Sequence, residues 1–260
     1  MPKDEYEIIV VDNASTDNTK ELMRQFSTIS NLRYIYEPVL GLSQARNTGW
    51  CDAKGGYVAF LDDDAIASPS WLAKIVEVFE TIKPKPGCLG GKIDPIWESP
   101  KPSWVSEKLI PQLAIIDWGD KPIFLNSNQW LVGANMAFQK NLLIKTGGFS
   151  SNLGRKGKVL LSMEEEFLKQ KIEKMGYNCF YHPAILVQHH IQPHRLSKKW
   201  FTERAYWNGV SSAVIEMNLR RSSFLGKISK GITTFLRILF SRRELLCLLT
   251  PTNDPEDFAV

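Results

Sequence analysis

Three consecutive aspartates, Asp62–Asp64, directly follow the apolar run Tyr57–Leu61. A short run rich in β-branched and aromatic residues is typical of a buried strand. Adjacent carboxylates repel one another and lose hydration beside a core strand, so folding alone does not favour them there. A divalent cation bound to a phosphate would offset this cost, because Mg²⁺ is held by one or two carboxylates together with substrate phosphates. The alternative is that they precede a helix that begins after Ser68, where acidic residues are favoured, but this explains one aspartate better than three.

A second apolar run, Ile8–Val11, ends in the same way, in Asp12 and Asn13 before a polar turn. Ligands of open α/β sheets bind outside the carboxyl ends of the strands. Two strands that both end in aspartate therefore predict one shared crevice. Asp17 is equally well explained as a helix cap, whereas Asp12 lies directly at the strand end and is favoured as a ligand contact.

The first half of the chain alternates expected strands with expected helices. The strands are Glu7–Val11, Leu32–Tyr36, Tyr57–Leu61 and Gly87–Ile93, and the helices are Thr19–Phe26, Leu42–Cys51 and Trp71–Ile82. This order predicts an α/β fold in which a mainly parallel sheet is covered on both faces. The segment Asp94–Lys121 is rich in proline and tryptophan and has no clear period. We expect an irregular excursion whose tryptophans are core residues or sugar-stacking surfaces.

The second half is expected to continue with shorter elements. They are strands at Gln129–Ala137, Tyr177–Tyr181 and Ile185–Gln188, helices at Lys140–Thr146, Met163–Met175 and Ser197–Asn218, and a candidate mobile lid at Asn152–Lys158. We therefore expect one domain over residues 1–218 and a basic, amphipathic helical tail over residues 219–260.

The 260 residues are 43% hydrophobic and 23% charged, which is ordinary for a soluble globular protein. The four cysteines are far apart and form no C-x-x-C pair, so we expect no zinc site, no disulfide framework and a cytoplasmic location. The net charge is +4, but the segment Leu219–Leu249 alone carries seven basic residues against one acidic residue. The rest of the chain is therefore slightly acidic, which argues against nucleic-acid binding by that part. The apolar face of this tail either lies on an anionic membrane surface at the inner face of the cell membrane or packs on protein.

Taken together, these segments resemble the family 2 glycosyltransferases, which have a Rossmann-like GT-A fold. The resemblance runs from Glu7 to about Ser212. It rests on the order of four patterns: Val10–Asp17, Gly41–Gly49 followed by Phe60–Asp64, Gly133–Phe138, and Glu164–Glu165 followed by Gly176-Tyr177 and Val187–His189.

The resemblance implies a metal-dependent, inverting hexosyltransferase that uses a nucleotide-diphosphate sugar, with a UDP-sugar favoured. Expected nucleotide-sugar contacts are Asp12, Asn13, Arg46, Asp62, Asp63, Gly133, Ala134 and Asn135. Within the D-x-D motif, Asp64 would ligate Mn²⁺ or Mg²⁺. Asp62 would face the ribose or join the metal, and His189 would contact the metal or the diphosphate. From the residues alone, the alternatives are a surface cation for Arg46, a tight turn for Gly133–Asn135 and a structural histidine for His189.

Glu164 and Glu165 fall where the family has an acidic pair at a helix start. One of the two carboxylates would act as the general base that takes the proton of the acceptor hydroxyl. Glu165 stands where aspartate is usual. Acidic residues are also favoured by the helix dipole alone, which is the structural alternative. The acceptor would be a saccharide or a lipid-linked glycan in surface polysaccharide or glycolipid assembly.

One departure from the family concerns the N-terminus, because members usually begin with a further strand and helix. An N-terminally truncated form would have an exposed sheet edge and an incomplete donor site. Two rival functions follow: a non-catalytic, truncated relative of the transferases, and a nucleotidyltransferase, which would require a glycine-rich phosphate loop that this chain does not show.

Overall fold

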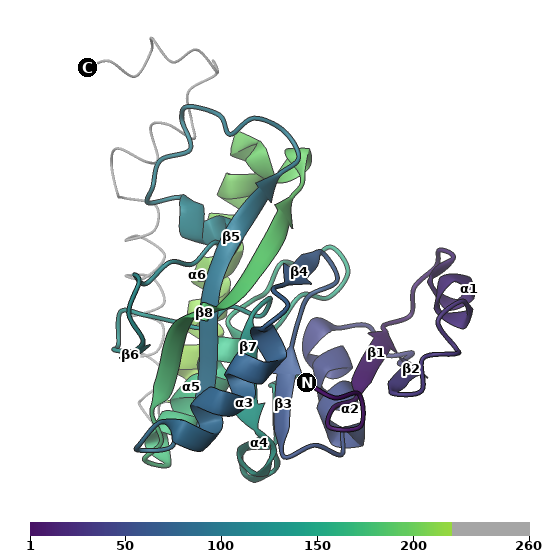
Figure 1. The fold of residues 1–260 in the computed structure, drawn as a ribbon. Helices are drawn as coiled ribbons and strands as arrows, with labels where there is room; N and C mark the ends of the chain where they lie inside the picture. The colour runs from purple at the N-terminus through teal and green to yellow at the C-terminus, as the bar shows by residue number, and fades with distance from the viewer. Residues whose placement is uncertain (220–260) are drawn as a thin grey trace.

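The computed structural model describes residues 1–219, and the predicted basic tail after Leu219 lies outside the described residues. Strands and helices alternate through the first half, as expected (Figure 1). The strands are β1 (Ile8–Asp12), β2 (Leu32–Tyr36), β3 (Tyr57–Phe60), β4 (Ala65–Ala67), β5 (Cys88–Trp97), β6 (Ile123–Phe124), β7 (Met136–Gln139) and β8 (Cys179–Ile191). The helices are α1 (Thr19–Arg24), α2 (Leu42–Asp52), α3 (Trp71–Thr81), α4 (Lys140–Thr146), α5 (Glu164–Lys174) and α6 (Lys198–Leu219), with 3₁₀ turns η1 (Ile110–Leu113) and η2 (Pro193–Leu196).

The strands form two separate sheets. The parallel pair β1–β2 is one sheet, and the other has the order β3-β7-β5-β8-β4, with β6 also paired to β8. Pairing is parallel between β5 and β8 but antiparallel for β3–β7, β5–β7, β4–β8 and β6–β8. The larger sheet is therefore mixed rather than mainly parallel, because apolar runs do not encode strand direction. The α/β fold class is confirmed.

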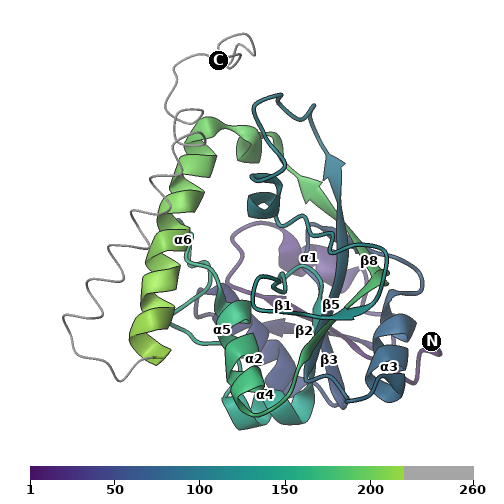
Figure 2. The same ribbon diagram turned by 90° about the vertical axis from the view of Figure 1, so that its left-hand side faces the viewer.

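The two faces of the larger sheet are covered by different helices. Figure 2 shows α3 on one side of the sheet and α2, α4 and α5 on the other. Neighbouring strand residues alternate between these faces: Cys88 and Met136 pack with Leu168 of α5, whereas Leu89 and Ala137 pack with the helix on the other face. This double coverage is what buries both faces of the central strands.

A third apolar cluster joins the irregular excursion to the end of the chain that the structure describes. Val105, Leu109 and Leu113 pack against Leu196 and Phe201. The excursion is therefore anchored between η2 and α6, although it contains little regular structure. In the described part of the chain, no helix combines the length and apolar character needed to span a membrane.

Several expectations need correction. The segment Gln129–Ala137 forms a strand only from Met136, and the two expected strands after Tyr177 are one long strand, β8. The expectation of no disulfide is wrong: Cys88 and Cys179 form one, with Cα atoms 4.8 Å apart. The two cysteines are 91 residues apart in the sequence, so their proximity could not be predicted from it. They lie close together because they are register partners on the adjacent strands β5 and β8.

Candidate active site

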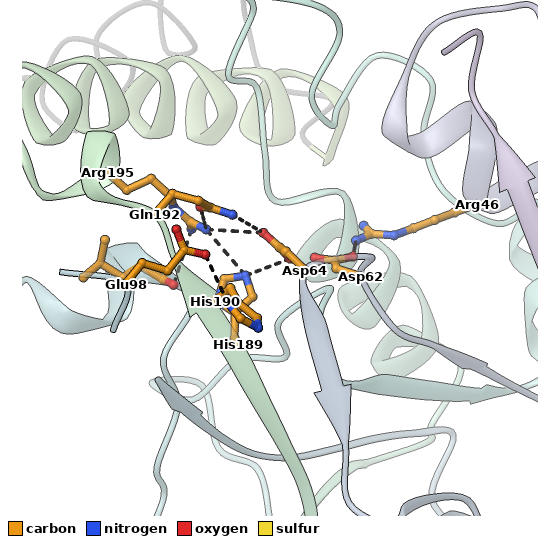
Figure 3. Close-up of polar contacts among 9 residues, drawn as sticks. Arg46, Asp62, Asp64, Glu98, His189, His190, Gln192 and Arg195 are labelled. Carbon is orange, nitrogen blue, oxygen red and sulfur yellow. Dashed lines mark hydrogen bonds and ion pairs between the residues drawn. The ribbon is translucent and has the colours of Figure 1, made fainter. Parts of the chain in front are cut away.

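Asp64 lies in a polar cluster at the junction of β3 and β4 (Figure 3). Its Oδ1 atom is 3.1 Å from His189 Nε2, and its Oδ2 atom accepts a 3.2 Å hydrogen bond from Gln192 and lies 3.8 Å from Arg195 Nη1. The β4–β8 pairing makes this contact possible, since the amide of His190 donates to the Asp64 carbonyl at 2.9 Å. The structure thus brings Asp64 and His189 together, as a shared metal site would require.

Burial raises the pKa of Asp64, but the hydrogen bonds from His189 and Gln192 and the charge of Arg195 outweigh it and lower this pKa to about 2. Asp64 is therefore ionised at neutral pH, as a metal ligand must be. The neighbouring His190 contacts Glu98 at 3.1 Å (Figure 3).

Arg46 joins the aspartate segment to helix α5. Its Nη2 atom is 3.0 Å from Asp62 Oδ1, and its Nη1 atom is 2.6 Å from Glu164 Oε1. The Arg46 side chain is 7% exposed and that of Glu164 is 4% exposed, so this is a buried ion pair between residues 118 positions apart. Arg46 is therefore no surface cation but the link between the Asp62–Asp64 segment and the acidic residues at the start of α5.

Gly133 leaves the space that Arg46 occupies. A Cβ atom at position 133 would lie 2.1 Å from Arg46 Nη2, which no side chain could tolerate without displacing the guanidinium. Ala134 is fully buried. Gly133 thus allows the arginine to approach closely, and the predicted contact of Gly133 and Ala134 with a donor sugar stays a prediction.

The three carboxylates Glu164, Glu165 and Glu166 occupy the first turn of α5. Burial and the negative charge of Glu164 raise the pKa of Glu165 to about 8, against the opposing charges of Arg46 and Arg204. The Oε2 atoms of Glu164 and Glu165 are buried without a hydrogen-bond partner. A buried acceptor left unpaired costs free energy, so these oxygens suit a ligand that brings a hydroxyl donor.

Asp12 and Asn13 lie at the carboxyl end of β1, and their contacts stabilise the neighbouring loops. Asp12 accepts hydrogen bonds from the amide of Ser15 at 2.9 Å and the hydroxyl of Tyr34 at 2.6 Å. Asn13 accepts from the amide of Gly41 at 2.7 Å, directly before the helix that carries Arg46. Asp63, by contrast, has an exposed side chain.

The Asn135 side chain is fully engaged inside the protein. Its Oδ1 atom accepts a 2.8 Å hydrogen bond from Trp71 Nε1, and its Nδ2 atom donates to the carbonyls of Lys92 at 3.0 Å and Ile185 at 2.8 Å. Asn135 therefore ties α3 to β5 and β8. Any contact with a donor sugar would have to come from its backbone.

Replacing Asn135 with alanine is expected to lower the free energy of unfolding by about 2–4 kcal/mol, because it leaves several buried polar groups unpaired. Urea unfolding of Asn135→Ala measures this, and the exposed Asn128→Ala is the matched control. Unchanged unfolding together with lost nucleotide-sugar binding would instead assign the Asn135 side chain to the ligand.

The candidate lid is attached to the start of α2. Ser43 Oγ donates to the Leu153 carbonyl at 2.7 Å, and the Leu42 amide donates to the Arg155 carbonyl at 2.9 Å. A Cβ atom at Gly154 would lie 3.5 Å from the Glu164 carboxyl carbon. The segment therefore borders Glu164 of the expected acidic pair, which is where a lid would act, and its mobility stays a prediction.

Sequence reasoning did not assign Gln192 or Arg195 to the site. Both follow His189 within six residues. Their position just after a predicted site residue at a strand end was the signal that could have identified them. Arg195 is buried, with its Cζ atom 5.3 Å from the Trp200 ring centroid. The described residues contain no group of three or more His, Cys, Asp or Glu side chains close enough to hold a metal by themselves. Asp64 and His189 fit a site that phosphate oxygens complete.

The chain was compared with known protein families and with individual proteins. A model described as glycosyl transferase family 2 matches residues 1–144. Over 213 residues the chain is 25% identical to a glucosyl-dolichyl phosphate glucuronosyltransferase of Haloferax volcanii, which covers 81% of this chain and 67% of the relative. It is 29% identical over 126 residues to a validoxylamine A glucosyltransferase of Streptomyces hygroscopicus, covering 46% and 30% of the two chains.

Solved structures show the same fold. A mannosyltransferase from Pyrobaculum calidifontis in complex with GDP-Man and Mn²⁺ matches with a TM-score of 0.60 and 20% identity, over 95% of this chain and 65% of that one. S. aureus TarS 1–349 in complex with UDP-GlcNAc matches with a TM-score of 0.54 and 17% identity, over 93% and 66%. The chain spans about two thirds of the length of these two proteins and of the Haloferax volcanii relative. Because the family model covers more than half of its residues, the chain belongs to glycosyl transferase family 2.

Proposed function

We propose that this chain is a metal-dependent, inverting glycosyltransferase that moves a sugar from a nucleotide-diphosphate sugar to a saccharide or lipid-linked acceptor. The observation that carries the proposal is the buried bridge from Asp62 through Arg46 to Glu164. It connects the carboxylates at the strand end with the carboxylates at the start of α5. Donor binding and acceptor activation thereby belong to one site.

Asp64 and His189 would hold Mn²⁺ or Mg²⁺, with the remaining ligands supplied by diphosphate oxygens. When bound, the cation would neutralise the charge that develops on the departing nucleoside diphosphate. Arg195 Nη1 lies 3.8 Å from Asp64 and 3.5 Å from His189 Nε2, so its positive charge would also be available to the diphosphate. Asp62, Asp63 and the Asp12–Asn13 turn would contact the nucleoside of the donor.

Glu165 is the proposed general base. Its ionised carboxylate would accept the proton of the acceptor hydroxyl, while the hydroxyl oxygen attacks the anomeric carbon. The oxygen–carbon bond forms on the face opposite the breaking bond to the diphosphate, so the configuration inverts. Glu164, paired with Arg46, would position Glu165 rather than take the proton itself.

The nucleotide is a UDP in this proposal, although the structural neighbours include complexes with both GDP-Man and UDP-GlcNAc. A relative that glucuronidates glucosyl-dolichyl phosphate supports a lipid-linked acceptor. Family membership favours sugar transfer over the nucleotidyl transfer considered from the sequence.

The test is release of nucleoside diphosphate from a panel of UDP- and GDP-sugars, with Mn²⁺ or with EDTA. The proposal expects slow release into water with one donor, accelerated by a mixed set of alkyl glycosides and abolished by EDTA. A folded protein that releases no nucleoside diphosphate from any donor would support the non-catalytic alternative.

A further inference from the structure

A groove of about 430 Å³ lies between the irregular excursion and the junction of η2 with α6. These segments meet at one end of the long strands β5 and β8 (Figures 1 and 2). The groove is lined by Pro102, Ser103, Trp104, Leu196, Ser197 and Lys198.

The lining has the character of a sugar site. Trp104 is partly exposed and offers a flat aromatic ring, while Leu196 forms a buried apolar floor. Ser103 lies at an exposed position of the rim, whereas the Ser197 hydroxyl donates to the His194 carbonyl at 2.9 Å and accepts from the Trp200 amide at 3.2 Å. The C–H face of a pyranose packs on an aromatic ring while its hydroxyls bond to the polar groups around it. An apolar surface with a few placed polar groups is the usual composition of a ligand pocket.

Trp104 differs from the other tryptophans of this region. Trp118 and Trp130 pack edge to face, with ring centroids 4.9 Å apart. Trp104 instead packs one edge on Phe201, at a centroid distance of 5.3 Å and an interplanar angle of 80°, and it also lines the groove. Its ring is thus held in a fixed orientation, which lowers the entropic cost of binding a ligand.

A continuous series of contacts leads from this groove to the candidate active site. Phe201 packs on Trp200 at 5.2 Å, and the Arg195 guanidinium lies over the Trp200 ring. Arg195 is in turn 3.8 Å from Asp64. The expected catalytic and metal-binding residues do not line the groove, so it is separate from the reaction centre and linked to it through Trp200 and Arg195.

We infer that this groove binds a neutral sugar unit of the acceptor, next to the unit that carries the attacking hydroxyl. The inference rests on the proposed function. It makes the acceptor at least a disaccharide, with Trp104 stacking on the non-reacting sugar. It also gives one tryptophan of the excursion the sugar-stacking role that the sequence left open.

The test uses ¹⁹F NMR of the full chain labelled with 5-fluorotryptophan, in which Trp104→Phe identifies the Trp104 signal. The probes are maltose, cellobiose, lactose and chitobiose, with methyl β-glucoside and sorbitol as references. We expect one of the disaccharides to shift the Trp104 signal at concentrations where sorbitol does not. Ser103→Phe should abolish this shift by filling the groove, and Ser106→Phe, an exposed change outside the lining, should preserve it.

The inference is overturned if all four disaccharides leave the Trp104 signal in place, if sorbitol shifts it equally, or if the shift survives Ser103→Phe. Release of nucleoside diphosphate into water separates this result from the proposed function, because water needs no acceptor groove. The control variant Ser106→Phe, outside the groove lining, should release it at the rate of the parent chain. A parent that releases none from any donor contradicts the proposed function, while the NMR result still decides whether the groove binds a sugar.

Discussion

Replacing Glu165 with glutamine is expected to lower kcat by about 10²–10⁴-fold, the usual contribution of a general base, and to leave nucleotide binding unchanged. Glutamine keeps the size of the side chain but cannot accept the acceptor proton. The measurement is kcat at saturating donor, with nucleotide affinity determined in parallel. Glu166→Gln is the matched control, because Glu166 lies in the same helical turn but accepts from Gln170 and pairs with Lys169.

The pH profile gives a second result for the same residue. Burial beside Glu164 raises the pKa of Glu165 to about 8, so below this pH the carboxyl group is mainly protonated and cannot act as a base. The parent activity should therefore rise with pH and level off above the pKa of Glu165. The residual activity of Glu165→Gln should lack this rise. A helix start that merely attracts acidic residues predicts equal, small effects of glutamine at Glu165 and Glu166.

Replacing Arg46 with methionine is expected to lower the free energy of unfolding by about 3–5 kcal/mol, because it leaves a buried carboxylate without its partner. The carboxylate concerned is Glu164, whose side chain is 4% exposed. Adding Glu164→Gln should restore part of the stability, since the unpaired charge is then removed. Urea unfolding of the single and double variants measures both effects.

Arg33 offers a matched control for this prediction. It also pairs with two carboxylates, Glu7 and Asp52, but its side chain is 35% exposed. Exposed ion pairs contribute about 0–1 kcal/mol, so Arg33→Met should have a small effect. Equal losses for Arg33→Met and Arg46→Met would contradict the account of Arg46 as a buried link.

Elements with strong local signals could be predicted from the sequence. The strand Leu32–Tyr36 and the helix Lys140–Thr146 have the bounds that were expected. The helix ends where Gly147 adopts a φ of 74°, a left-handed conformation that glycine reaches without strain. Strand direction and the partners of β7 and β8 depend on tertiary packing, which apolar runs do not specify.

The candidate site, like the fold, could be predicted from the sequence only in part. The aspartates after β3 stand out in the sequence because folding alone does not favour them. Their connection to Glu164 could not be predicted, because Arg46 reaches across 118 positions and its burial depends on Gly133. Asn135 shows the opposite case: the family motif predicted a nucleotide-sugar contact at this position, whereas the structure uses its side chain to join α3, β5 and β8.

The most direct test of the account is calorimetry of UDP and GDP binding, with and without Mn²⁺, for the parent chain and for Asp64→Ala. We expect one nucleotide to bind in a Mn²⁺-dependent manner and Asp64→Ala to lose that dependence, since Asp64 supplies the carboxylate beside His189. Asp63→Ala is the matched control for an exposed aspartate of the same segment. No binding by the folded parent chain, or Mn²⁺-dependent binding that survives Asp64→Ala, would contradict the proposed donor site.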